Sequence, residues 1–311
     1  MTARWTKDRP VSLQKFMGMF PDEDTCFQYL EKKRWPDGFV CPGCESVDGY
    51  RLLERRWTWR CRDCNRQTSL TAGTIMHGSH LPLRTWFLAA HLAATHSNGI
   101  SALQLQAKLG IGSYKSAWFL LHRLRKSMVD PDRSPLAGIV EIDESSIPYR
   151  PKDEPVAGGH GRSPIGKMVI VGAVELHEGR IPGRIRLAAI PDFKRETLHG
   201  FVTGATVKGS EIWTDGNTAY ATAPDRTVHP RVIGQMAAHI LMPWIHRAFS
   251  NLKRFAMGVY HGFRRRYLQA YLDEFVFRWN RRRHYRVSFD SLLGIGIGVG
   301  PLSLRALRAT C

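Results

Sequence analysis

Two pairs of cysteines constrain the fold of this 311-residue chain more tightly than any other feature of its sequence. Cys41-Pro-Gly-Cys44 is followed, after 16 residues, by Cys61-Arg-Asp-Cys64. Each CxxC turn is tight enough to direct two sulfurs at one metal ion, and four thiolates at this spacing are typical of a zinc site. The segment between the pairs has a glycine turn and β-prone ends, which predicts a zinc ribbon. The alternative is two disulfides, which require an oxidising compartment.

This zinc is expected to be structural, because four thiolates leave no open position for a substrate. It would hold together an N-terminal module, residues 1–80, that is too small to build a core alone. The other two cysteines, Cys26 and Cys311, have no partner at a matching spacing. Cys26 lies in a helical pattern, so we expect a buried thiol rather than a fifth ligand.

The charge of the chain points to a polyanionic partner. The formal net charge is +18, from 45 Lys and Arg against 27 Asp and Glu. From Arg226 to the end there are 15 Lys and Arg but 3 Asp and Glu, so the excess is concentrated there. Such a field attracts nucleic acid, and 43% hydrophobic residues argue against a disordered chain.

No targeting or membrane segment is expected. The first residues, MTARWTKDRP, lack the apolar core of a signal peptide. No apolar run reaches the ~18 residues of a membrane span. The most apolar run, LLGIGIGVGPLSL, is short and interrupted by glycine, so it is expected to be buried. We therefore expect a cytoplasmic, nucleoid-associated protein with no membrane partner.

Residues 81–130 predict a helix-turn-helix segment. Ser101 and Gln104 have the spacing of a capping box, and Gly110 and Gly112 flank a short turn between two apolar, periodic stretches. A basic second helix after such a turn is typical of a recognition helix in the DNA major groove. The alternative is a helix pair that serves only as scaffold. The basic residues expected to be exposed on the second helix are Lys115, His122, Arg123, Arg125 and Lys126.

The remaining residues, 131–311, alternate strand-like and helical patterns after the linker VDPDRSP. Three strands, a helix, a strand, a helix, a strand and a helix follow the order of a ribonuclease-H-like α/β domain with a mixed sheet. The strands are expected at 138–145, 167–176, 184–191, 210–215 and near 227–233, and the helices at 192–206, 241–258 and 267–284. Residues 150–166, rich in Gly and Pro, are expected to form a mobile loop.

Two aspartates stand at informative positions in this pattern. The predicted topology places the first and fourth strands side by side, which makes neighbours of Asp143 and Asp215. Isolated aspartates at strand ends are usually turn residues, but this pair is better interpreted as two metal ligands. Glu141 shares a strand face with Asp143 and is expected to have a structural or supporting role. Glu144 is expected to point away.

Long stretches of the sequence resemble bacterial insertion-sequence transposases that have an N-terminal zinc ribbon and a DDE-type catalytic domain with Asn as its third residue. The resemblance covers nearly the whole chain. It rests on FPDEDTCFQYLEKKRWPDGFVCPGC, RCRDCNRQTSLTAGTIMHGSHLPLRTWFLAAHL, GISALQLQAKLGIGSYKSAWFLLHRLR, VEIDES, WTDGNTAY, and PWIHRAFSNLKRFAMGVYHG with YLQAYLDEFVFRWNRRR.

The resemblance implies that Asp143, Asp215 and Asn251 form the catalytic set and bind magnesium or manganese, with Lys253 close by. No acid occurs between Asp225 and Asp273, so Asn251 occupies the position where a carboxylate is expected. Two alternatives stay open at this stage. Asn251 could cap a turn, or His246 on the same predicted helix could be the third ligand.

The implied activity is metal-dependent cleavage of DNA at the element ends, followed by attack of the 3′-hydroxyl on target DNA. The zinc ribbon and the helix-turn-helix would recognise the terminal inverted repeats, with the protein acting as a homo-oligomer on DNA. A non-catalytic DNA-binding regulator and a structure-specific nuclease of the same fold are the alternatives. The residues expected to contact DNA are Lys115, Arg123, Arg125, Arg264, Arg265, Arg266, Arg281, Arg282 and Arg283.

Overall fold

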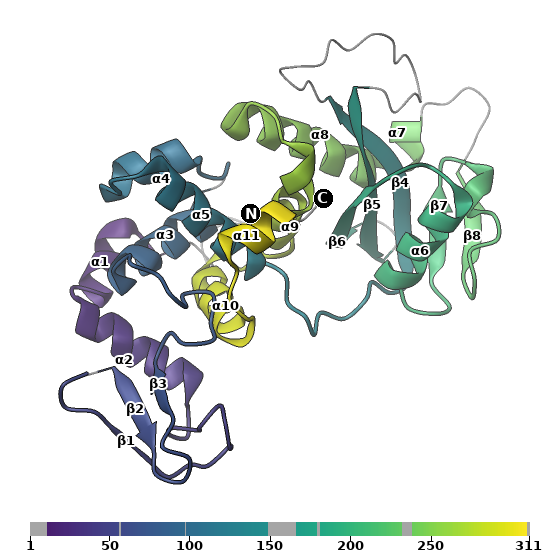
Figure 1. Ribbon diagram of the computed structural model, residues 1–311. Helices are drawn as coiled ribbons and strands as arrows, with labels where there is room; N and C mark the ends of the chain where they lie inside the picture. The colour runs from purple at the N-terminus through teal and green to yellow at the C-terminus, as the bar shows by residue number, and fades with distance from the viewer. Residues whose placement is uncertain are drawn as a thin grey trace, which may run out of the picture. The chain divides into compact units, whose positions relative to one another are not determined.

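The computed structural model describes residues 11–55, 57–96, 98–148, 166–178, 181–231 and 238–309 (Figure 1). The chain forms two compact units. Of the described residues, the first unit contains those in 11–130 and 283–309, and the second contains those in 131–282. The predicted catalytic segment, 131–311, therefore includes residues that pack in the first unit, and its functional boundaries stay a prediction. The predicted mobile loop, apart from Gly166, and Cys311 lie outside the described residues.

The zinc-ribbon region contains a three-stranded antiparallel sheet in the order β1-β2-β3. Its strands are β1 (Gly49–Arg51), β2 (Thr58–Cys61) and β3 (Gln67–Ser69). Trp35, Phe39 and Trp59 form a small aromatic core beside it, and the Trp35 and Trp59 rings lie 4.8 Å apart. Gly49 is needed under Phe39, because a Cβ there would lie 2.4 Å from that ring. A core this small is typical of modules that a structural metal ion stabilises.

The rest of the first unit is helical. The two helices that the capping-box pattern predicted are present, and both hydrogen bonds of the box between Ser101 and Gln104 are formed. Gly110 ends the first of them at a φ of 63°, a conformation that glycine adopts readily. The helices of this unit are α1 (Leu13–Met19), α2 (Glu23–Arg34), α3 (Leu83–Thr95), α4 (Ala102–Leu109), α5 (Tyr114–Lys126), α10 (Tyr285–Gly298) and α11 (Leu304–Ala309).

Helix α10 completes the core of the first unit from the far end of the sequence. Leu292 and Leu293 are fully buried, and the Ile75 N–H donates to the Gly296 carbonyl at 3.2 Å. The prediction that the apolar run LLGIGIGVGPLSL is buried is therefore confirmed for its leucines in α10. Cys26 of α2 is also fully buried, as expected for a helical thiol.

The expected exposure of the basic residues of α5 is wrong for three of them. His122, Arg123 and Arg125 are buried, with 1%, 8% and 2% of their surface exposed. The Arg123 Nε donates to the Leu302 carbonyl at 3.1 Å, so the C-terminal segment covers this side of the helix. A pattern within one helix cannot show which face a distant segment covers. Lys115, near the start of α5, is exposed as predicted.

The second unit is built on a five-stranded mixed sheet in the order β6-β5-β4-β7-β8. β4 pairs antiparallel with β5 and parallel with β7, and β8 extends the parallel side. The first and fourth strands of this unit are therefore neighbours, as predicted. The strands are β4 (Ile139–Pro148), β5 (Lys167–His177), β6 (Ile181–Ile190), β7 (Glu211–Thr214) and β8 (Thr227–Pro230).

Helices cover both faces of this sheet (Figure 1). α6 (Arg195–Ala205) packs on one face, where Val140 and Ile142 of β4 point. α8 (Pro243–Tyr260) and α9 (Leu268–Asn280) pack on the other, where Phe275 of α9 belongs to the core and Tyr271 and Trp279 pack against it. The short helix α7 (Ala238–Leu241) precedes α8. Because side chains alternate along β4, Glu141 and Asp143 belong to the α8 face.

The three arginines at the C-terminal end of α9, which were expected to contact DNA, are not equally exposed. Arg282 is half-buried, and its Nη1 donates to the Trp279 carbonyl at 2.8 Å and the Gly183 carbonyl at 3.2 Å. It closes the last turn of α9 against β6. Arg281 is also half-buried, whereas Arg283 is exposed. The exposure that contact with DNA requires is therefore found at Arg283 and is restricted at Arg281 and Arg282.

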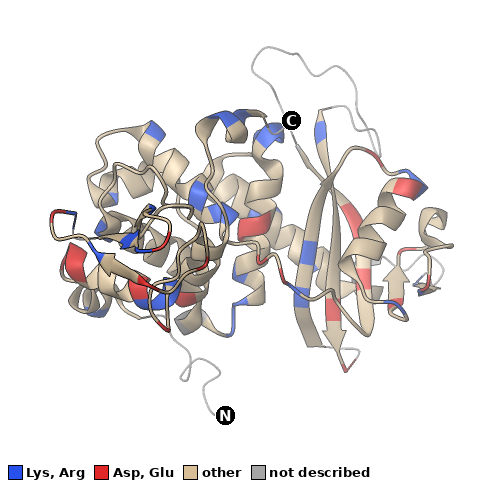
Figure 2. Cartoon of the chain, turned by 60° about the horizontal axis from the view of Figure 1, so that its bottom comes forward, with Lys and Arg blue, Asp and Glu red and all other residues tan. Residues whose placement is uncertain are grey.

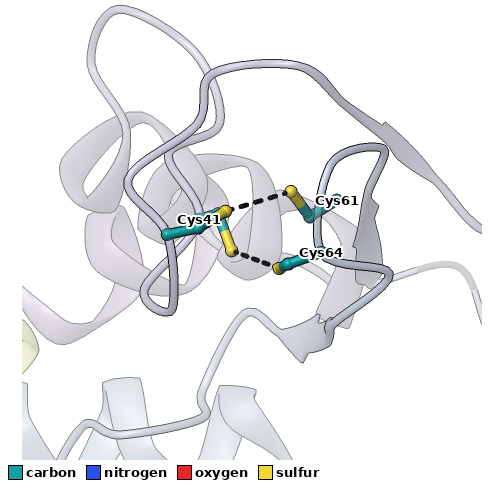
Figure 3. A group of neighbouring side chains, drawn as sticks. Cys41, Cys61 and Cys64 are labelled. Carbon is teal, nitrogen blue, oxygen red and sulfur yellow. Dashed lines mark hydrogen bonds between the residues drawn. The ribbon is translucent and has the colours of Figure 1, made fainter.

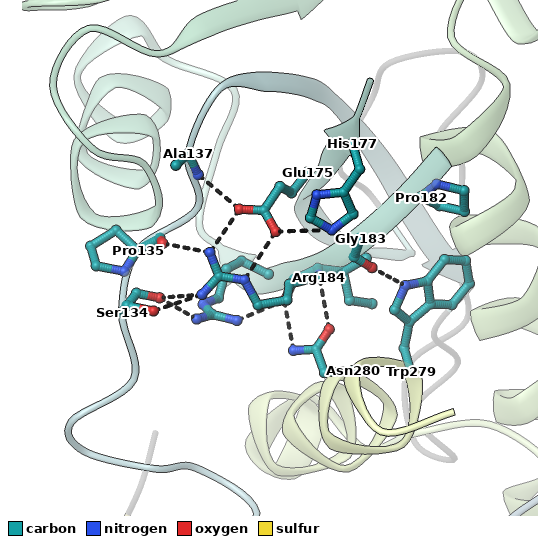
Figure 4. Close-up of polar contacts among 12 residues, drawn as sticks. Ser134, Pro135, Ala137, Glu175, His177, Pro182, Gly183, Arg184, Trp279 and Asn280 are labelled. Carbon is teal, nitrogen blue, oxygen red and sulfur yellow. Dashed lines mark hydrogen bonds and ion pairs between the residues drawn. The ribbon is translucent and has the colours of Figure 1, made fainter. Parts of the chain in front are cut away.

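At the end of β5 far from the aspartates, a buried carboxylate ties the interunit linker to the sheet (Figure 4). Glu175 accepts from Arg184 Nη2 at 2.7 Å and from the Ala137 N–H at 2.9 Å. Arg184 Nη1 also donates to Ser134 Oγ at 2.7 Å. Burial raises the pKa of Glu175, but the Arg184 hydrogen bonds outweigh it and the pKa is lowered. The network fixes the start of the second unit.

Candidate metal centres and nucleic-acid surface

The four predicted zinc ligands converge at one point (Figure 3). Their sulfurs all lie within 4.8 Å of one another. Cys41 Sγ is 3.5 Å from Cys64 Sγ, and Cys44 Sγ is 3.6 Å from Cys61 Sγ. Four sulfurs around a tetrahedral zinc ion would lie ~3.8 Å apart, given zinc–sulfur bonds of about 2.3 Å. The cluster is therefore consistent with a structural zinc ion.

The backbone of each knuckle favours the thiolate form that zinc requires. The Gly43 N–H donates to Cys41 Sγ at 3.4 Å and lowers the pKa of that thiol to about 6. Backbone N–H groups, that of Cys64 foremost, also lower the pKa of Cys61. Cys26 lies outside this cluster, and burial raises the pKa of its thiol to about 12.

Asp143 and Asp215 lie side by side because β4 and β7 are parallel. The last residues paired between these strands are Glu141 and Trp213, and each aspartate follows two residues later. The same register therefore places Asp143, in the middle of β4, beside Asp215, which directly follows β7. One carboxylate oxygen from each of Asp143, Asp215 and Glu144 lies within 4.8 Å of the other two. Three oxygen donors at this separation suit a hard divalent cation.

Glu144 does not point away, so that expectation is wrong. Asn217 Nδ2 donates to Glu144 Oε1 at 2.9 Å, and the Asn217 N–H donates to Asp215 Oδ1 at 3.0 Å. Asn217 thus connects two of the three carboxylates. The Glu144 N–H also donates to Asp143 Oδ1 at 2.8 Å. The motif DGN in WTDGNTAY is a turn signal that could have identified Asn217 beforehand.

The carboxylates are held in an environment that disfavours their charge. The pKa of Asp143 is raised to about 7, mainly by burial, against the opposing effect of the Glu144 N–H and with the support of the charges of Asp215 and Glu144. Burial also raises the pKa of Glu144, and that of Glu141 to about 7. A bound cation would relieve this repulsion, which is the behaviour expected of metal ligands.

Helix α8 brings a histidine to the carboxylates. His246 Nε2 lies 3.6 Å from Asp143 Oδ2. Asn251 and Lys253, which were expected beside the aspartates, are both exposed on the same helix. An α-helix turns by about 100° per residue, so Asn251 lies ~140° around the axis from His246. The two residues therefore flank different sides of α8.

Basic residues are spread over both units (Figure 2). Arg264, Arg265 and Arg266, between α8 and α9, are exposed, as are Arg254 and Lys253 of α8. Together with the net charge of +18 they offer phosphates several accessible cations. Within the described residues, no helix has both the length and the apolar character that crossing a membrane requires.

Comparison with known proteins identifies both parts of the chain. Residues 135–280 match the ISXO2-like transposase domain, and residues 21–67 match the transposase zinc-ribbon domain. A curated protein of Halobacterium salinarum, described as an uncharacterized protein in transposable element ISH50, is 33% identical over 145 residues. That match covers 44% of this chain and 47% of the relative, so the chain spans about half the length of the relative it matches.

The fold and the two sites define a protein in which a small module with a four-cysteine cluster precedes an α/β domain with a carboxylate cluster. The chain belongs to the ISXO2-like transposases of insertion-sequence elements, with an N-terminal transposase zinc ribbon and a DDE transposase domain.

Proposed function

We propose that this protein is a DNA transposase that binds the ends of its element, cleaves the DNA by metal-assisted hydrolysis and joins the 3′-hydroxyl end to target DNA. The observation that carries the proposal is the parallel register of β4 and β7, which aligns Asp143 with Asp215. The strand order, and the packing of α8 on the sheet face that carries Asp143, support a ribonuclease-H-like domain.

The carboxylates of Asp143, Asp215 and Glu144 would hold magnesium or manganese. When bound, such cations activate the attacking oxygen and stabilise the leaving oxygen of an in-line displacement at phosphorus. The oxygen donors and the raised pKa of Asp143 fit such an ion. Glu144 supplies the third carboxylate that the segment around Asn251 lacks.

His246 is proposed to support the metal centre through Asp143, and Asn251 and Lys253 to contact the DNA strand. The 3.6 Å approach of His246 to Asp143 and the exposure of Asn251 and Lys253 favour this division. Asn251 as a metal ligand is the competing hypothesis. Its amide oxygen is a suitable donor in principle, but it brings no charge to the site.

DNA phosphates are proposed to contact exposed cations, with the helix pair α4–α5 and the zinc ribbon recognising the terminal inverted repeats. Lys115 is accessible at the start of α5, where residues of a recognition helix meet base edges. Arg264, Arg265, Arg266 and Arg283 are the other accessible members of the predicted set. Arg123 and Arg125 are buried in the first unit and contribute to its core rather than to DNA binding. A cytoplasmic homo-oligomer on DNA is the proposed working form.

A strand-transfer assay tests this proposal. The purified protein is mixed with element-end DNA, a target plasmid, and magnesium or manganese. A transposase cleaves and joins, a nuclease of the same fold only cleaves, and a DNA-binding regulator does neither. We expect joining by the wild type and none by Asp215→Asn, with unchanged DNA binding. Cleavage without joining, or joining by Asp215→Asn, would reject the proposed activity.

The identity of the third residue of the metal site, besides Asp143 and Asp215, is tested by comparing Glu144→Gln, His246→Ala and Asn251→Ala. We expect Glu144→Gln and His246→Ala to weaken manganese binding, measured by electron paramagnetic resonance without DNA. Asn251→Ala should keep the affinity for manganese and lose affinity for DNA. If Asn251→Ala weakens manganese binding as severely as Asp143→Asn does, Asn251 is a metal ligand after all.

A further inference from the structure

Helix α8 begins without a capping side chain of its own. Its N-cap residue is Met242, followed by Pro243, and neither caps it through a side chain. The first N–H groups of a helix have no partner within the helix. Here the N–H groups of Trp244 and Ile245 donate to Glu141 Oε2 at 2.9 and 2.8 Å. A strand residue more than a hundred positions earlier therefore caps the helix.

Glu141 is suited to this task by its burial and its charge. Only 1% of its surface is exposed, and it lies on β4 two residues before Asp143 on the same face. A carboxylate at a helix N-terminus is stabilised by the helix dipole as well as by its hydrogen bonds. Among the described residues, the carboxylates grouped for metal binding do not include Glu141. Its carboxylate serves the helix instead.

The sheet is also shaped to receive this first turn. Gly172 of β5 pairs with Asp143, and a Cβ at Gly172 would lie 2.9 Å from side-chain atoms of both Ile245 and Phe249. Only glycine lets α8 approach the sheet so closely beside the aspartate. The residue after Ile245 is His246, whose Nε2 lies 3.6 Å from Asp143 Oδ2.

We propose that Glu141 is a positioning residue, which fixes the first turn of α8 on β4 and thereby holds the His246 imidazole against Asp143. The proposal rests on the proposed metal-dependent function and assigns Glu141 no contact with substrate or metal. His246 restricts the orientation of the Asp143 carboxylate. The removal of Glu141 would therefore change metal binding through His246 and then Asp143. Partners of metal ligands typically change metal affinity by about 10- to 100-fold when removed.

The test uses Glu141→Ala and Glu141→Gln in the full-length protein, with Glu175→Gln as the matched control. Glu175 is likewise a buried sheet carboxylate that accepts a backbone N–H, but it pairs with Val140 and therefore lies on the sheet face opposite to Glu141. Two quantities are measured besides thermal stability. They are the manganese affinity and, in the metal-free protein, the NMR signals of the His246 ring, assigned by their loss in His246→Gln.

For Glu141→Ala we expect manganese affinity to fall about 10- to 100-fold and the His246 ring signals to shift. Glu141→Gln keeps one acceptor oxygen, so its effects should be in the same direction but smaller, and it serves if the alanine variant does not fold. Glu175→Gln should lower stability while leaving both quantities unchanged. If the Glu141 variants lower stability and leave both quantities unchanged, Glu141 is merely structural and the inference is wrong. Failure of the wild type to bind manganese would contradict the proposed function, whereas the metal-free His246 signals still decide the role of Glu141.

Discussion

Asp143 is the residue at which folding and metal binding are most clearly opposed. Its pKa is raised to about 7 in the folded protein, mainly by burial, from an ordinary value of 3.8. The folded state therefore binds this proton more tightly than the unfolded state does. It follows that the free energy of unfolding contributed by Asp143 increases as pH falls from about 7 toward 4, and is lowest above pH 7. A cation at the site should reverse this trend.

Asp143→Asn is accordingly expected to stabilise the metal-free protein at pH 8 while removing its response to metal. We expect its melting temperature to exceed that of the wild type by about 3–6 °C at pH 8, and by less at pH 5. Manganese should raise the melting temperature of the wild type only. Calorimetry at the two pH values measures both effects. A variant less stable than the wild type at pH 8 that still responds to manganese would refute this explanation.

Single residues were predictable from the sequence where the backbone pattern decides their position. Asp143 and Asp215 follow apolar strand runs, so the topology alone predicts that they meet. Glu144 was not predictable, because strand alternation assigns it to the opposite face. Pairing between β4 and β7 ends at Glu141 and Trp213, and beyond it Asn217 draws the longer Glu144 side chain toward the cluster.

At the scale of elements, the zinc ribbon is expected to depend on its four thiolates. Cys61→Ser should reduce the zinc content from about one equivalent to none and unfold β1–β3, since the aromatic core beside them is small. Cys26→Ser is the matched control, because that thiol is buried in α2 and outside the cluster. Elemental analysis and the fluorescence of Trp59 measure the two effects. Equal loss of zinc in both variants would contradict the ligand assignment.

Two basic residues of helix α5 are expected to have different roles, one in DNA binding and the other in stability. Lys115→Ala should weaken binding to element-end DNA without lowering the melting temperature, because Lys115 is exposed. Arg123→Ala should lower the melting temperature, because it removes the bond to the Leu302 carbonyl and leaves a space in a buried region. Fluorescence anisotropy with labelled DNA measures the DNA affinity, and thermal melts measure the melting temperature. A stability loss in Lys115→Ala with normal DNA binding would assign α5 to scaffold.

Helices and strands were predicted to within a few residues wherever apolar periodicity was regular, as in β5 and α9. The exposure of their polar faces was less predictable. The positive charges of Arg123 and Arg282 suggest contact with solvent or phosphate. Each side chain instead donates a hydrogen bond to a carbonyl group of another segment. Side-chain hydrogen bonds over long sequence separations leave no local signal, so only the folded structure shows them.

For the whole molecule, the order of its parts was predictable from composition, and the linker at 129–135 contains the boundary between the two compact units. The return of residues 283–309 to the first unit was not predictable. Helix α10 carries an apolar pattern that any core could accept, and its partners α2 and α3 lie about 260 and 200 residues earlier in the chain. The predicted resemblance to zinc-ribbon transposases is confirmed by both matched domains.

The most direct test of the central claim is an anomalous difference map from crystals of the full-length protein grown with manganese. We expect manganese density bound by the carboxylates of Asp143 and Asp215 in the wild type, and none at that position in Asp215→Asn. The absence of density there in the wild type, at a manganese concentration that supports DNA joining, would show that these carboxylates are not the metal centre.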